Sequence, residues 1–306
     1  MDKIAFVFSG QGDQFPGMGK DLYEKYPVAQ RIYDLCDSIR PGTSTQCFNS
    51  TEEELRETRN TQPCLFAMEL AAASILIEKG IVPDALAGFS LGEVVAATVS
   101  GIFDDKTGFR LVCKRGELMQ SEAEKFDTAM AAVVKLTSEQ VQDICRRYPD
   151  VYPVNFNCPG QITVSGISSQ MTDFLADVKA AGGRAIPLKV KGAFHSPFMK
   201  AAAEAFEREL NKAAIKERNI VLYSDVTAEV YTNDVAGLLS KQICSPVQWE
   251  KIIRNMITDG IDTFIEIGPG KTLTNMIKKI STDIKAVNVI EYLAEVEGCW
   301  MEKQRL

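Results

Sequence analysis

The sequence predicts an α/β protein with a mostly parallel sheet that helices cover on both faces. The first observation is an alternation along most of the 306 residues, in which short apolar segments that suit buried strands are followed by helical stretches. The second is residues 127–190, where two expected strands follow one another without a helix between them. The third is size, since 306 residues with 45% hydrophobic content suffice for one large domain carrying a smaller insertion.

The first 126 residues begin with a strand and a glycine-rich loop, Gly10-Gln11-Gly12, and are otherwise mainly helical. Pro63 falls in the expected first turn of a long apolar helix, where proline is tolerated, and Gly80 ends that helix. Asp104 and Asp105 can cap another helix. In order, we expect a strand at 3–9, helices at 21–37, 52–59 and 61–79, a strand at 85–87, and helices at 93–99 and 105–123.

Residues 127–190 show the order β-α-β-β-α-β, which is typical of a ferredoxin-like unit. Ser138 is expected to cap the first of its two helices. The expected elements are a strand at 129–134, a helix at 138–147, strands at 152–156 and 161–165, a helix at 168–181 and a strand at 184–189. We therefore predict a ferredoxin-like subdomain at 127–190, inserted into a larger subdomain made of residues 1–126 and 191–306.

The alternation of strands and helices resumes after the insertion. A loop that contains His195 leads into a helix ending near residue 214, and another helix is expected before residue 245. The remaining expected elements are strands at 220–224, 263–267 and 286–290, helices at 249–259 and 272–280, and a closing helix. These strands would complete the parallel sheet of the larger subdomain.

Composition excludes several classes of function. A net charge of −7 argues against nucleic acid as the main partner. This net charge does not exclude a local basic patch that receives an acidic partner. Met1-Asp2-Lys3 leads directly into a strand, and no apolar stretch reaches the ~20 residues that span a bilayer, so we expect neither a signal peptide nor a membrane partner. The eight cysteines are scattered and the chain has one histidine, a pattern that argues against a metal site. Reduced thiols fit a cytoplasmic protein.

The hexapeptide Gly88-Phe89-Ser90-Leu91-Gly92-Glu93 is the strongest candidate for chemistry. A Gly-x-Ser-x-Gly pattern between a strand and a helix is the context of a nucleophile elbow, a tight turn that exposes a serine hydroxyl. Glycines flank the serine because side chains there would clash with the strained turn. The alternative is a glycine-rich loop with an idle serine, and the pentapeptide alone does not decide between the two.

His195 is the only histidine of the chain, so an imidazole base for Ser90 has to be this residue. It lies in a loop between an expected strand and a helix, where active-site residues are common. The alternative is an ordinary surface or core histidine. No acid between Ser90 and His195 stands out as the group that orients the ring, and a backbone carbonyl is an open alternative.

Two backbone N–H groups and one arginine suit a substrate with negative charge. An oxyanion hole needs two donors, for which the Leu91 N–H and the loop around Gln11 are the natural candidates. The Gln11 loop is otherwise a plain turn or a fragment of a dinucleotide loop, although it lacks the third glycine of that motif. Arg115, expected in the middle of a helix, would bind a substrate carboxylate through its planar fork if it points into the site; otherwise it is a solvated arginine.

Several separated motifs, taken in order, resemble the malonyl-CoA:acyl-carrier-protein transacylases of bacterial fatty-acid synthesis and the related acyltransferase domains of polyketide synthases. The resemblance covers essentially the whole chain. It implies an α/β-hydrolase-like core with a ferredoxin-like small subdomain. The motifs are Phe8-Ser9-Gly10-Gln11-Gly12, Thr61-Gln62-Pro63, the Ser90 hexapeptide, Arg115-Gly116, Asn155-Phe156-Asn157-Cys158-Pro159-Gly160-Gln161, Gly192-Ala193-Phe194-His195-Ser196, Ser245-Pro246-Val247-Gln248-Trp249 and Glu266-Ile267-Gly268-Pro269-Gly270.

The resemblance implies a role for each matching residue. Ser90 would carry the malonyl group as an ester, and His195 would act as general base and acid. The backbone N–H groups of Gln11 and Leu91 would form the oxyanion hole. Arg115 would hold the malonyl carboxylate.

The resemblance also assigns supporting roles. Gln248 would orient His195 through its main-chain carbonyl, and Gln62 would line the site. Phe194 and Leu91 resemble the residues of malonyl-selective members. Phe89 stands where the family often has histidine, a departure that we expect to alter packing beside the elbow more than chemistry.

The implied activity is ping-pong transfer of malonyl from malonyl-CoA to the phosphopantetheine thiol of acyl carrier protein, with no cofactor and no metal. We expect a cytoplasmic monomer in fatty-acid biosynthesis. The alternatives are a trans-acting polyketide acyltransferase, a serine thioesterase or esterase, and a non-catalytic docking module. Lys189, Lys191 and Lys200 are a candidate landing patch for an acidic carrier, with a plain solvated edge as the alternative.

Overall fold

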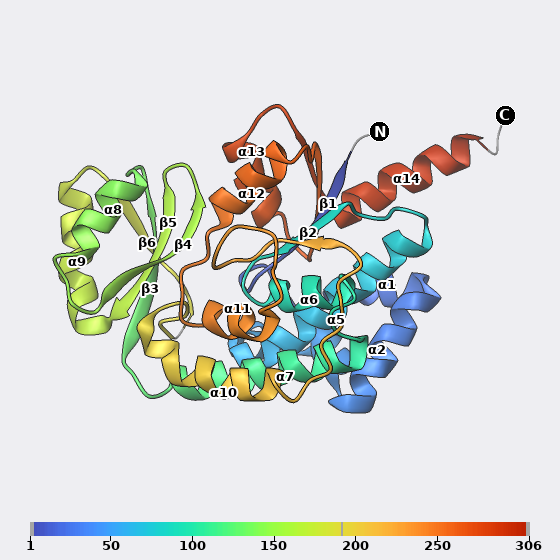
Figure 1. Ribbon diagram of the computed structural model, residues 1–306, viewed down its shortest axis with the longest axis horizontal. Coiled ribbons are helices and arrows are strands. Elements are labelled where there is room, and N and C mark those ends of the chain that lie inside the picture. Colours follow the sequence, from blue (N-terminus) through green and yellow to red (C-terminus); the bar gives the residue numbers. More distant parts are fainter. Residues whose placement is uncertain (1–2, 191, 304–306) are drawn as a thin grey trace.

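The computed structural model describes residues 3–190 and 192–303, apart from the side chains of 299–303. It contains a parallel and an antiparallel sheet, each with its own helices (Figure 1). The parallel sheet has the order β7-β2-β1-β8-β9, and each neighbouring pair in it is parallel. Its strands are β1 (Ile4–Phe8), β2 (Ala85–Gly88), β7 (Val221–Leu222), β8 (Thr263–Ile267) and β9 (Lys285–Asn288). This sheet confirms the predicted α/β class.

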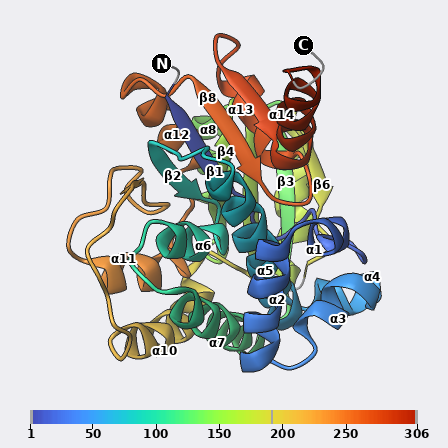
Figure 2. The same ribbon diagram turned by 90° about the vertical axis from the view of Figure 1, so that its right-hand side faces the viewer.

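Helices cover both faces of the parallel sheet, which explains why its strands are mainly apolar. On one face Phe6 and Phe8 pack in a core with residues of α2, α5, α6 and α7. On the other face Ala5 and Val7 pack with residues of α12 and α13. Figures 1 and 2 show the same division, with α12 and α13 on the opposite side of β1 and β2 from α5 and α6.

The helices in this part of the molecule are named in the order in which they occur along the chain. They are α1 (Lys20–Lys25), α2 (Pro27–Ile39), α3 (Thr43–Asn49), α4 (Glu52–Arg56), α5 (Thr58–Glu78), α6 (Gly92–Val99), α7 (Asp105–Ala123), the short 3-10 helix η1 (Pro197–Met199), α10 (Lys200–Leu210), α11 (Val235–Gln242), α12 (Trp249–Thr258), α13 (Thr272–Ile280) and α14 (Val289–Lys303). Helix α3 had no counterpart among the sequence predictions.

The second sheet is antiparallel, with the order β4-β5-β3-β6, and it has a separate hydrophobic core. Its elements are β3 (Thr128–Val134), α8 (Ser138–Cys145), β4 (Val151–Cys158), β5 (Gln161–Ile167), α9 (Ser168–Ala180) and β6 (Arg184–Pro187). The predicted order β-α-β-β-α-β is therefore present. Strand β4 also contacts the segment before α12, because the Val247 N–H donates to the Val154 carbonyl and the Phe156 N–H to the Val247 carbonyl, both at 2.9 Å. These bonds hold the second sheet beside the first.

Three local predictions were wrong at helix ends. The helix expected at 21–37 is broken at Tyr26, because Pro27 starts α2 as its first residue. Pro63 lies inside α5 and not in its first turn, since the helix begins earlier, at Thr58. Thr137, not Ser138, caps α8 by accepting from the Gln140 N–H in a capping box.

Three findings concern the helices and the side chains that the structure describes. Among the described helices, none combines the length and the apolar character that crossing a membrane requires. All seven cysteines whose side chains are described are free thiols, and most of them are buried. In the same described part of the chain, no cluster of three His, Cys, Asp or Glu side chains has a metal-binding arrangement.

Candidate active site

Ser90 lies at a tight turn between β2 and α6, as the hexapeptide predicts. Its φ is 58°, a left-handed conformation that is strained for a residue with a side chain. A Cβ added at Gly88 would collide with the backbone of Gly92 and Glu93, and one at Gly92 would collide with the Phe8 carbonyl. Both glycines are therefore required for α6 to approach β1 and β2 this closely.

His195 is in hydrogen-bond contact with Ser90, because His195 Nε2 lies 2.8 Å from Ser90 Oγ. The other ring nitrogen, Nδ1, lies 2.8 Å from the Gln242 carbonyl oxygen. A carbonyl only accepts, so Nδ1 carries the proton and Nε2 is free to accept from Ser90. This tautomer is the one that a general base for Ser90 needs.

The carbonyl beside His195 corrects the sequence prediction, which named Gln248. Gln242 is the last residue of α11, and carbonyls in the last turn of a helix have no partner within the helix. Its carbonyl is therefore available to His195. Gln248 instead precedes α12, and its N–H donates to the Asp225 carbonyl at 2.9 Å.

Burial keeps His195 neutral. The side chain is almost completely enclosed, and this burial, followed by the charge of Arg115, lowers the pKa of His195 from 6.5 to about 4. The Gln242 carbonyl opposes the shift by stabilising the protonated ring. At neutral pH the imidazole is consequently unprotonated and able to accept a proton.

Arg115 on α7 is 1% exposed and points at the nucleophile, so it is not a solvated arginine. Its Nη1 donates to Gln62 Oε1 at 2.7 Å. Its Nη2 donates to Gln242 Oε1 at 2.6 Å and to Ser90 Oγ at 3.2 Å. Burial lowers the pKa of Arg115 to about 10, which leaves the guanidinium charged at neutral pH. The two glutamines thus fix a cation beside the serine.

A small cavity of about 90 Å³ brings most of the predicted site residues together. Within the described part of the chain, no hydrogen bond occupies the backbone N–H of Gln11 or of Leu91. Gly10 lets the Gln11 loop approach the elbow, since a Cβ there would lie 2.8 Å from the Phe89 ring. The cavity is lined by Gln11, Thr58, Gln62, Phe89, Ser90, Leu91, Arg115, Met119, Met130, Asn155, Leu188, Val190, Phe194 and His195.

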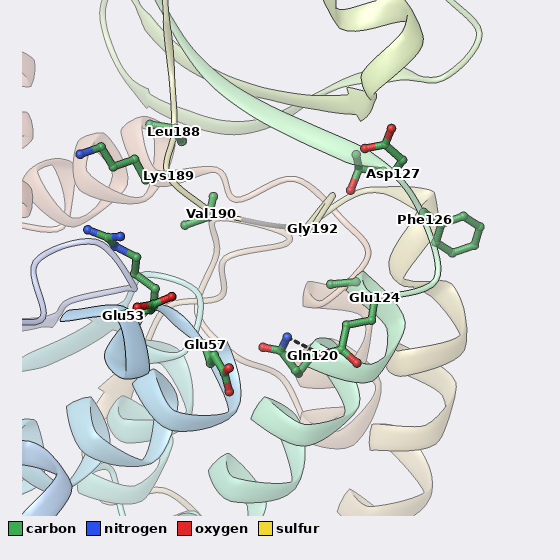
Figure 3. A pocket seen from close by; sticks show the side chains of 13 residues that line it. Glu53, Glu57, Gln120, Glu124, Phe126, Asp127, Leu188, Lys189, Val190 and Gly192 are labelled. Carbon is green, nitrogen blue, oxygen red and sulfur yellow. Dashed lines mark hydrogen bonds between the residues drawn. The ribbon is translucent and has the colours of Figure 1, made fainter. Parts of the chain in front are cut away.

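A second, larger cavity of about 820 Å³ adjoins the first and shares Leu188 and Val190 with it. Figure 3 shows Leu188, Lys189 and Val190 on one side of this cavity, across from Glu53 and Glu57. Its lining is Glu53, Arg56, Glu57, Gln120, Ala123, Glu124, Phe126, Asp127, Thr128, Leu188, Lys189, Val190 and Gly192.

Other predicted residues take different places. Phe89 packs edge-on against Trp249, with ring centroids 5.5 Å apart, beside the elbow. Lys189 lines the larger cavity, whereas Lys200 borders a separate hollow and pairs with Glu204 at 4.0 Å. Lys191 lies outside the described residues.

Sequence reasoning missed Gln242 and Asp225. Asp225 Oδ2 accepts the backbone N–H of Ser90 at 2.7 Å, and Gln242 contacts Ser90, His195 and Arg115. Neither residue belongs to a motif with a recognisable spacing. Gln242 reaches the elbow from the end of α11 and Asp225 from the loop after β7, and both are distant from Ser90 in the sequence.

Comparisons with known proteins agree with this geometry. Residues 5–299 match the acyl transferase domain family. The malonyl CoA-acyl carrier protein transacylase of Bacillus subtilis is 40% identical over 298 residues, with 94% of each chain covered. The crystal structure of the transacylase of that name from Clostridium perfringens has a TM-score of 0.92 at 34% identity, with 99% of both chains covered.

A malonyl-transacylase solved in complex with its type II polyketide-synthase acyl-carrier protein has a TM-score of 0.90 at 32% identity. The match covers 94% of this chain and 95% of that one. These relatives extend over nearly the whole sequence, so the similarity is not confined to the elbow. The chain therefore belongs to the acyl transferase family, alongside the malonyl CoA-acyl carrier protein transacylases.

Proposed function

We propose that this protein transfers the malonyl group from malonyl-CoA to the phosphopantetheine thiol of an acyl carrier protein, through a malonyl ester on Ser90. The observation that carries the proposal is the buried guanidinium of Arg115, 3.2 Å from the Ser90 hydroxyl. A simple esterase or thioesterase has no need of a fixed cation beside its nucleophile. An acyl group that ends in a carboxylate does, because burying that charge without a partner is costly.

In the first half-reaction His195 Nε2 accepts the Ser90 proton while Ser90 Oγ attacks the thioester carbonyl. The negative charge that develops on the carbonyl oxygen is stabilised by the N–H groups of Gln11 and Leu91. The C–S bond then breaks, and His195 returns the proton to the departing CoA thiolate. The products are free CoA and malonyl-Ser90.

The second half-reaction is the reverse with a different thiol. His195 takes the proton of the carrier's phosphopantetheine thiol, and the thiolate attacks the Ser90 ester. Ser90 leaves with the proton from His195, and the malonyl thioester of the carrier is released. The proposal requires no metal and no cofactor.

Arg115 gives the malonyl group a defined orientation. Gln62 and Gln242 hold the guanidinium at 2.7 and 2.6 Å, so its direction is set before the substrate arrives. A malonyl group held by its carboxylate has its carbonyl carbon placed for attack. Such fixation favours transfer of malonyl over acetyl, which lacks the carboxylate.

The larger cavity is the proposed route for the phosphopantetheine arm, and the carrier is the proposed partner. Support comes from the relative whose structure contains an acyl-carrier protein. Fatty-acid synthesis is the proposed pathway, with trans-acting polyketide synthesis as the alternative. The cytoplasmic location and the monomeric state remain predictions.

We also propose that the molecule has an α/β-hydrolase-like core with a ferredoxin-like subdomain at 127–190. The strand order β4-β5-β3-β6 supports the second assignment. The nucleophile turn between β2 and α6 supports the first.

Intact-mass measurement tests the proposed function. The protein incubated with malonyl-CoA should gain one malonyl group, and Ser90→Ala should gain none. Adding phosphopantetheinylated carrier protein should move the group to the carrier. Release of free malonate in place of transfer would favour a hydrolase, and the lack of any adduct on the wild type would favour a docking module.

A further inference from the structure

Two carboxyl groups next to the nucleophile have no part in the mechanism above. Glu93 on α6 and Asp225 in the loop after β7 are both 0% exposed. Neither residue lines the cavity around Ser90. Burying a carboxylate is costly unless hydrogen bonds or a positive charge compensate it, so two of them at this position call for an explanation.

Both carboxyl groups contact a single side-chain nitrogen, Gln242 Nε2. Glu93 Oε2 accepts from it at 2.5 Å and Asp225 Oδ2 at 3.1 Å. Glu93 Oε1 accepts from the Asp225 N–H at 2.9 Å and from the Tyr231 hydroxyl at 2.7 Å. Asp225 Oδ2 also accepts the Ser90 N–H at 2.7 Å. The pair therefore supports the elbow directly.

The same pair lies next to the carboxylate clamp. The amide oxygen of Gln242 accepts from Arg115 Nη2 at 2.6 Å while its nitrogen contacts both acids. The charged and titratable groups that face the pair are Arg115 from α7 and Tyr231. His195 lies against the other side of Gln242 and is neutral.

Two full negative charges on one amide nitrogen would repel one another. Burial raises the pKa of Glu93 to about 7, and burial together with the Glu93 charge raises the pKa of Asp225 well above its ordinary range. The pKa of Tyr231 is also raised by burial, so its hydroxyl stays neutral and donates to Glu93. Near neutral pH the pair thus retains a proton.

We propose that Glu93 and Asp225 are positioning residues that together retain one proton, so that a single negative charge balances Arg115 and leaves the clamp attractive to a substrate carboxylate. The inference rests on the proposed function, because the carboxylate of malonyl makes acylation by malonyl-CoA sensitive to the charge of this cluster. Loss of this proton makes the net charge of the buried cluster of Glu93, Asp225 and Arg115 negative. Malonyl is then repelled, whereas acetyl, which has no carboxylate, is unaffected.

The test follows acylation of Ser90 by malonyl-CoA and by acetyl-CoA from pH 6 to pH 9. In the wild type the malonyl-to-acetyl ratio of kcat/KM should fall by about tenfold with rising pH. In Asp225→Asn only one acid remains, so the ratio should change by less than about threefold. Asparagine keeps an oxygen for the Ser90 N–H, which preserves the support of the elbow.

Two further variants separate charge from structure. Asp225→Ala removes the acceptor of the Ser90 N–H and should slow acylation by both substrates more than Asp225→Asn does. Glu266→Gln changes another buried carboxyl, on β8, which caps α13 through the Leu273 and Thr274 N–H groups and makes no contact with Gln242. It should retain the pH dependence of the wild type.

A tenfold fall that persists in Asp225→Asn, or a flat ratio in the wild type, would overturn the inference and leave the malonyl-Ser90 adduct in place. A wild type that forms no adduct with malonyl-CoA would overturn the proposed function and this inference together.

Discussion

Arg115 Nη2 donates a hydrogen bond to Ser90 Oγ at 3.2 Å, although Arg115 lies on α7 and Ser90 lies in the turn before α6. The hydroxyl that we propose as the nucleophile and the cation that we propose as the holder of the substrate carboxylate are therefore in direct contact. Gln62 accepts from Nη1 of the guanidinium, and Gln242 accepts from the same Nη2 that contacts Ser90. From this contact we expect charge at the far end of the acyl group to determine reactivity.

Arg115→Ala should lower kcat/KM for malonyl-CoA by about a hundredfold while sparing transfer of acetyl, because it removes a charge-assisted pair with the substrate carboxylate. The measurement is the rate of Ser90 acylation with each thioester. Arg115→Lys serves as the comparison, since it keeps the charge without the planar fork. An equal loss for both substrates would contradict the clamp.

Gln242→Leu should reduce malonyl transfer by about tenfold or more, since it frees Arg115 Nη2 and removes the contact with Ser90 O. The backbone carbonyl that orients His195 is unchanged in this variant, so acetyl transfer should fall less. Comparing the transfer rates of malonyl and acetyl distinguishes the contribution of the Gln242 side chain from that of its backbone carbonyl. Gln248→Leu, outside the cavity, is the control and should behave as the wild type.

The acid limb of the acylation rate should lie near pH 4 and not near 6.5. His195 is the base only when unprotonated, and burial with the Arg115 charge lowers its pKa to about 4. Activity is therefore retained from neutral pH down to about 5 and is lost as pH falls through the folded-state value. The pH profile of kcat/KM with acetyl-CoA measures this without a titrating substrate carboxyl. A midpoint near 6.5 would contradict the burial of the ring.

Glu69→Gln should stabilise the protein at pH 8 more than at pH 5. Glu69 is completely buried, accepts from the Ser9 hydroxyl, and burial raises its pKa well above 4.5. A raised folded-state pKa contributes stability that is present below 4.5 and is lost as pH rises. The difference should be on the order of 1 kcal/mol in the free energy of unfolding, measured with urea at both pH values. Equal effects at the two pH values would show that the pKa of Glu69 does not change on folding.

Gly92→Ala should lower the yield of folded protein or its Tm strongly, because the new Cβ would collide with the Phe8 and Ser9 carbonyls. Gly298→Ala on α14 is the matched control, since among the described residues no atom other than those of its chain neighbours and its own helix backbone lies within 4 Å of the added Cβ. That substitution should leave Tm unchanged or raise it slightly. Thermal unfolding of the two variants compares them directly.

Local sequence patterns alone predict the α/β class, the parallel sheet, the strand-turn-helix around Ser90, and His195 as the single imidazole. These features are local: apolar periodicity, glycine spacing and residue counts decide them without knowledge of distant contacts. The same local rules gave the β-α-β-β-α-β order of residues 127–190. They failed at the start of α2 and α5, where packing and Pro27 set the helix ends.

Which groups contact Ser90 depends on how segments that are distant in the sequence pack together. Gln242, and not Gln248, orients His195 across 47 residues of sequence, and Asp225 reaches the Ser90 N–H across 135. No periodicity or motif encodes such a pairing, because it depends on where α11 ends and how the loop after β7 packs on α6. Arg115 likewise has the pattern of a helix-surface residue, and burial against Gln62 and Gln242 makes it part of the site.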